Sequence, residues 1–66
     1  MKTTKLSAGV YQVVDTDWAI MNDSRNCWWV AKIVDGYASF EPNERFFVSG
    51  SRNDAIQYAK MLEMQQ

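Results

Sequence analysis

The sequence contains no histidine and one cysteine, and both scarcities exclude chemistry. Without histidine the commonest general base is missing, so neither a Ser-His-Asp nor a Cys-His catalytic arrangement can form. A zinc site needs several Cys and His ligands at short spacing, and Cys27 alone does not supply them. The sequence therefore predicts a protein that is not an enzyme and that holds no metal or cofactor.

Glycine, proline and long apolar runs are also scarce. The three glycines form neither a phosphate-binding loop nor a dinucleotide-binding pattern. No apolar run approaches the roughly 18 residues of a membrane-spanning helix. The two lysines near the start precede no apolar segment, so this region does not resemble a secretory signal. With one unpaired cysteine, these features predict a cytoplasmic protein without a membrane partner.

Charge of one sign is not in excess, because 7 basic residues oppose 8 acidic ones and the net charge is −1. Proteins that bind nucleic acid through its phosphates usually carry a marked basic excess. A nucleic-acid partner is therefore less favoured than a protein partner. Asp15 and Asp17 lie two residues apart, but a calcium loop needs more oxygen ligands than this stretch offers.

What the chain has in quantity is aromatic residues: three Trp, three Tyr and three Phe among 66 residues. Aromatic side chains bury a large area each, so a few of them build a core from a short chain. The length fits one domain over residues 1–66. We expect a loosely ordered start at 1–9, a sheet at 10–49 and a helix at 51–65.

Short β-rich runs alternate with turn residues, which is typical of an antiparallel meander. Asp35-Gly36 is a strong hairpin signal, because both residues of such a turn need a positive φ. Residues 15–17 must hold a turn or a bulge if the apolar positions on either side are to share one face. We expect a loop at 22–26, and the predicted strands are residues 10–14, 18–21, 27–34, 37–40 and 45–49.

The last third of the sequence changes to a helical pattern. Ser51 and Asp54 have the spacing of a capping box, in which each side chain bonds the other's backbone N–H. Ala55, Ala59 and Leu62 then form one apolar stripe. The predicted fold class is α+β, with an antiparallel meander of four to five strands and one C-terminal α-helix packed on one face.

The two-residue turn sets the register of its hairpin and divides the side chains between two faces. We expect the wholly apolar set to meet the helix, together with Phe46 and Val48; this set is Cys27, Trp29, Ala31, Ile33, Ala38 and Phe40. The opposite set would face solvent, together with Phe47 and Arg45; it is Trp28, Val30, Lys32, Val34, Tyr37 and Ser39. Two alternatives stay open: the start of the chain folds over the second face, or the two faces are inverted.

An exposed apolar face on a small protein usually marks an interaction site. The candidate partner-binding residues combine the aromatic face with acidic loops at its rim: Trp28, Val30, Lys32, Tyr37, Arg45, Phe47, Asp15, Asp17 and Asp23. The leading hypothesis is a module that binds a larger protein or protein complex. The alternatives are single-stranded nucleic-acid binding on the same aromatic face, with Arg25 nearby, and a structural homodimer.

A resemblance covers roughly the last 40 residues. From Trp28 the run W-W-V-A-K, followed by F-F-V-S-G-S-R-N-D-A-I-Q-Y-A, resembles small phage and bacterial sheet-plus-helix proteins of unknown function. The layout is also similar to short phage-encoded inhibitors of host enzymes, including those that act on RNA polymerase or on CRISPR complexes (anti-CRISPR proteins). The resemblance implies an inhibitor or regulator from a phage or mobile element that occupies a surface of a larger host complex.

Overall fold

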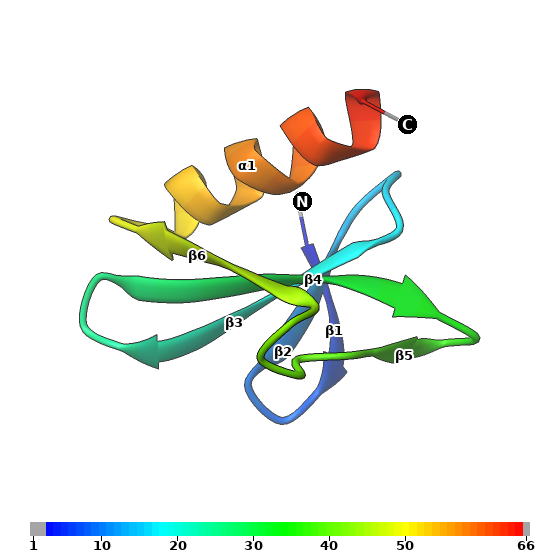
Figure 1. Ribbon diagram of the computed structural model, residues 1–66, viewed down its shortest axis with the longest axis horizontal. Coiled ribbons are helices and arrows are strands. Elements are labelled where there is room, and N and C mark those ends of the chain that lie inside the picture. Colours follow the sequence, from blue (N-terminus) through cyan, green and yellow to red (C-terminus); the bar gives the residue numbers. More distant parts are fainter. Residues whose placement is uncertain (1–2, 66) are drawn as a thin grey trace.

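The computed structural model describes residues 3–65 and confirms an α+β fold with an antiparallel sheet and a C-terminal helix. Figure 1 shows the helix lying across one face of the sheet. In chain order the elements are β1 (Thr3–Ser7), β2 (Val10–Val13), β3 (Trp18–Ser24), β4 (Cys27–Val34), β5 (Tyr37–Ala38), β6 (Arg45–Ser49) and α1 (Arg52–Met64).

The strands form one six-stranded sheet in which each printed pairing is antiparallel. Strands β1 to β4 follow one another in chain order. The second edge of β4 is shared, since β5 pairs with its last two residues and β6 pairs with residues 27–31. Strand β4 is therefore the central strand, and β6 is an outer strand with one neighbour.

The hairpin between β4 and β5 has the predicted register, with Val34 opposite Tyr37. Asp35 and Gly36 both have a positive φ, 54° and 83°, as this turn requires. The loop expected at 22–26 is shorter than predicted. Strand β3 continues to Ser24, where the Asn22 side chain donates to the carbonyl oxygens of Ser24 (3.0 Å) and Cys27 (3.2 Å).

The start of the chain is a strand rather than a loosely ordered segment. Thr3–Ser7 pairs with β2, and Thr3 is buried opposite Val13. The Arg52 side chain at the start of α1 donates to the Thr3 hydroxyl, so the helix as well as β2 holds this strand. The prediction was wrong here because the side chains of this strand are mostly polar and exposed, so they show no apolar pattern typical of a strand. Residues 1 and 2 of the predicted segment lie outside the described residues.

The helix begins with the predicted capping box. The Ser51 side chain accepts a hydrogen bond from the Asp54 N–H, and the Asp54 carboxylate accepts one from the Ser51 N–H at 2.8 Å. These bonds satisfy amide groups that an uncapped first turn leaves without partners. From there α1 buries Ala55, Ile56 and Ala59 against the sheet. The small alanine side chains allow a close approach of the helix.

The hydrophobic core lies between α1 and the sheet. It is formed by the buried cluster Val13, Trp18, Ile20, Val30, Ala55, Ile56 and Ala59. Tyr11 lies opposite Ile20, so the β2–β3 turn keeps both strands' apolar residues on one face, as predicted. We call this the helix-side face of the sheet and the opposite one the far face.

The two faces of β4 are inverted relative to our leading prediction, and the open alternative is the one observed. Val30 is fully buried in the core, and Trp28 packs against that core. Trp29 lies on the far face, opposite Phe47 of β6. Counting apolar residues failed because β4 carries large apolar side chains on both faces. For β6 the predicted faces are observed, since Val48 packs against the core and Phe47 is exposed, but Phe46 is 40% exposed and does not join the core as expected.

Candidate interaction surface

Three side chains form a compact cluster on the far face, which we call the Trp29 patch: Trp29, Arg45 and Phe47. The β4–β6 register brings them together, because Trp29 pairs with Phe47 and Ala31 with Arg45. The Phe47 ring meets the Trp29 ring edge-on, with centroids 5.2 Å apart. The Arg45 guanidinium carbon lies 3.8 Å from the centroid of the Trp29 ring, in a cation–π contact.

The charge on Arg45 has no anionic partner among residues 3–65. Its Nε atom is buried and has no hydrogen-bond acceptor. Stacking on Trp29 removes water from one side of the guanidinium, and a buried donor without an acceptor is energetically costly. An external carboxylate or carbonyl that bonded to the guanidinium would remove part of that cost.

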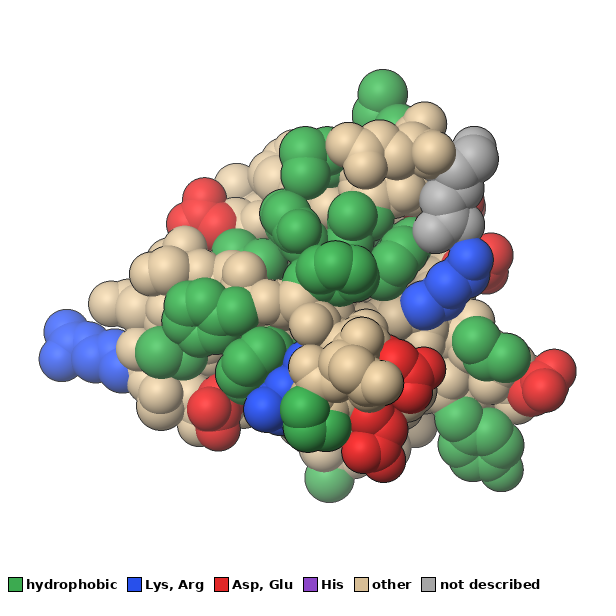
Figure 2. Space-filling model, in the orientation of Figure 1, with side chains coloured by type: hydrophobic (Ala, Val, Ile, Leu, Met, Phe, Trp, Pro, Cys, Tyr) green, Lys and Arg blue, Asp and Glu red, His purple; other side chains and the backbone are tan. Residues whose placement is uncertain are grey.

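Phe47 makes the patch apolar as well as cationic. Its side chain is 52% exposed even though its ring contacts Trp29. Figure 2 shows, below and to the left of its centre, a basic side chain lying among hydrophobic ones. Aromatic and arginine side chains contribute most of the binding energy at protein interfaces. The patch therefore has the composition of an interface centre.

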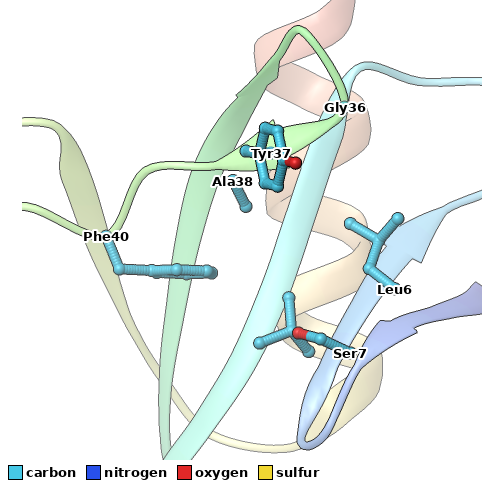
Figure 3. A pocket seen from close by; sticks show the side chains of 7 residues that line it. Leu6, Ser7, Gly36, Tyr37, Ala38 and Phe40 are labelled. Carbon is cyan, nitrogen blue, oxygen red and sulfur yellow. The ribbon is translucent and has the colours of Figure 1, made fainter.

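A second feature of the far face is a pocket of about 210 Å³. Leu6, Ser7 and Val10 line one side, and Tyr37, Ala38 and Phe40 line the other, together with Gly36. These residues come from strands far apart in the sheet order, so the sheet curls toward its far face. Figure 3 shows Leu6 and Phe40 on opposite sides of this space. Ala19 and Ala31, also on the far face, are fully buried.

The structure divides the predicted aromatic surface into three places. Trp28 and Val30 lie on the helix-side face, where Val30 is buried in the core and the partly buried Trp28 packs against it. Phe47 and Arg45 belong to the Trp29 patch. Tyr37 is 80% exposed but sits at the β4–β5 turn. Its partner Val34 is five residues along β4 from Trp29, a separation of about 17 Å.

The charged residues of the predicted surface are also separated. Asp15 and Asp17 lie in the β2–β3 turn, where the Asp17 N–H donates to Glu63 near the end of α1 at 3.2 Å. Asp23 lies near the opposite end of β3. Lys32 is exposed and lies opposite Trp18 of β3, away from β6. The acidic loops therefore do not form one rim around the Trp29 patch.

Trp29 is the residue that sequence reasoning missed, because it was assigned to the core. The available signal was the pairing of β4 with β6, which places Trp29 opposite Phe47. That pairing follows a long irregular connection, residues 39–44, whose length does not set a register.

Among residues 3–65, no group of three or more Cys, Asp or Glu residues is arranged to hold a metal ion. Over the same residues, no helix has the length and apolar character needed to cross a membrane. No family model, curated protein or solved structure matches the chain. The chemistry of the Trp29 patch is therefore the main guide to function.

Proposed function

We propose that this protein is a non-catalytic binding module that docks the Trp29 patch on a larger protein. The observation that carries the proposal is the Arg45 guanidinium, which is stacked on Trp29 without an acceptor beside the half-exposed Phe47. The partner surface should present a carboxylate surrounded by apolar side chains. The carboxylate would bond Arg45, and the apolar groups would cover Phe47.

A protein partner fits the charges better than a nucleic acid. The chain has a net charge of −1, and several basic residues near each other are needed to follow a phosphate backbone. Arg25 lies in the β3–β4 turn, and Arg52 is engaged with Thr3 and stacks over Tyr11 at 5.3 Å. Arg45 is thus the one arginine of the Trp29 patch.

The resemblance to short phage-encoded inhibitors extends the proposal. In this extension the module inhibits or regulates a larger host complex, such as a nucleic-acid enzyme or a CRISPR complex, by occupying one of its surfaces.

The test is quantitative affinity capture from a lysate of the cells in which the protein occurs. Phe47→Ser and Arg45→Gln each remove one member of the Trp29 patch, and Tyr37→Ser is the matched control because Tyr37 is exposed elsewhere. We expect the control to capture the same partner as the wild type. Each patch variant should lose about thirtyfold in affinity, equivalent to about 2 kcal/mol. Equal capture by all four proteins would contradict the proposal.

A second measurement separates the two partner classes. Single-stranded oligonucleotide is added at low salt while tryptophan fluorescence is recorded. We expect no change, because one arginine on an aromatic patch is too little charge for phosphate binding. Quenching that is reversed by added salt, and lost in Arg45→Gln, would instead support the nucleic-acid alternative.

A further inference from the structure

Two of the outer strands, β1 and β6, differ in how well they are protected against pairing with another strand; the third, β5, is only two residues long. Exposed edges are normally blunted by lysine, proline or a bulge. At one edge, β1 carries Lys5 near its middle and has a register irregularity between Lys5 and Ser7. Its other side chains are threonine, serine and one leucine. This edge is a poor template for a further strand.

The other edge, β6, has none of these devices. The sequence R-F-F-V-S contains neither lysine nor proline, and its register with β4 runs without a shift from Cys27↔Ser49 to Ala31↔Arg45. Among the described residues β6 pairs with β4 alone, so alternate backbone groups along it point away from the sheet. Phe46 on the helix-side face and Phe47 on the far face are 40% and 52% exposed.

We propose that β6 pairs edge to edge with β6 of a second copy of this chain. The pairing would be antiparallel about a two-fold axis at Phe47, the register that engages all five residues of the strand. Phe47 would then lie opposite Phe47 of the second copy, and Phe46 opposite Val48. Aromatic pairs and aromatic–β-branched pairs at directly opposite positions stabilise antiparallel sheets.

The charges along this edge suit a second copy. Arg45, the one charged residue within β6, would lie opposite the uncharged Ser49 of the other strand. Glu44 would lie opposite Gly50, close to the N-terminal end of α1 of the other copy, where a negative charge is favourable. No like charges face each other across the paired strands. The near-neutral net charge of −1 adds little overall repulsion.

The size of the interface sets its strength. A stable interface buries about 800 Å² per partner, close to a fifth of the 4430 Å² surface of this molecule. A five-residue edge with two flanking phenylalanine rings covers less than that. We therefore expect a weak, concentration-dependent dimer rather than a permanent one. Two members of the Trp29 patch, Arg45 and Phe47, also belong to this edge, whereas Trp29 lies in β4.

The first experiment measures average molar mass by light scattering across a concentration series. We expect the wild type to rise from the monomer value toward twice that value. Phe47→Lys places two like charges opposite each other and should remain monomeric. Tyr37→Lys makes the same change at an exposed site off the edge and should behave as the wild type. Far-UV circular dichroism checks that each variant is folded.

Hydrogen–deuterium exchange of the wild type locates the contact without a mutation. At high concentration, the amides of Arg45–Ser49 that do not bond to β4 should exchange several-fold more slowly than at low concentration. Amides of Thr3–Ser7 at the opposite edge serve as the internal control and should not change. A monomer at every concentration would overturn the proposal. A dimer whose β6 amides exchange unchanged would also overturn it, because the contact would then be face to face or elsewhere.

Discussion

Val30 and Val34 lie four residues apart in β4, yet their environments are opposite. Val30 is fully buried under α1, whereas Val34 is 57% exposed. Val30→Ala should lower the free energy of unfolding by about 2 kcal/mol, because it leaves a cavity in the core. Val34→Ala, the same change in the same strand, should cost less than about 0.5 kcal/mol. Urea unfolding measures both, and equal losses would contradict the observed burial of Val30 beneath α1.

The N-terminal cap of α1 provides a second test, which concerns the hydroxyl group of Ser51. Ser51→Ala removes the hydroxyl that accepts from the Asp54 N–H, so the unfolding free energy should fall by about 1 kcal/mol. Asn53→Ala is the control, since Asn53 is exposed in the same first turn and its side chain makes no hydrogen bond within residues 3–65. Thermal unfolding should show a lower Tm for Ser51→Ala alone. A matching drop in Asn53→Ala would show that the loss is not specific to the capping hydroxyl, because alanine itself favours the helix.

Among the elements, β1 yields the clearest prediction. Because Thr3–Ser7 pairs with β2 and Arg52 holds Thr3, the bonded amides of this strand should exchange slowly in hydrogen–deuterium exchange. Amides of Ala8 and Gly9 in the turn that follows should exchange fast and provide the reference. Uniformly fast exchange from residue 3 to residue 9 would contradict this strand and support a loosely ordered start.

Comparison of the elements shows what local sequence determines. Turn residues mark the ends of β4 and β6, so the limits of these strands were predictable. The Asp35-Gly36 turn and the Ser51 helix cap each depend on a few neighbouring residues and were predictable for the same reason. The side of β4 that meets the helix depends on pairing across residues 39–44, which no short pattern specifies. That is why Arg45 and Phe47 were predicted for the far face while Trp29 was not.

At the scale of the whole molecule, the core and the far face share the same strands. Ile20 and Val30 of the core alternate along β3 and β4 with Ala19 and Ala31, which are buried on the far face. Neither side can lose its packing without disturbing the other. We therefore expect one cooperative unfolding transition in urea, with coincident midpoints by tryptophan fluorescence and far-UV circular dichroism. Separate midpoints would show that the helix or the β1–β2 hairpin unfolds independently.

Edge pairing through β6 would also change how the molecule meets a partner. A two-fold axis perpendicular to the sheet keeps both far faces on the same side, so two Trp29 patches would lie next to each other. A partner with two matching surfaces would then bind both copies at once, and its apparent affinity would exceed that of one patch.

The neighbouring side chains of Trp28 and Trp29 point to opposite faces of the sheet. Their fluorescence can therefore report separately on the two faces. With Trp18 and Trp28 changed to phenylalanine, the emission of Trp29 would follow events on the far face of the sheet. With Trp18 and Trp29 changed instead, Trp28 would follow the seating of the helix. Loosening of the core beneath the helix and docking of a partner on the far face would then each change the emission of a different tryptophan.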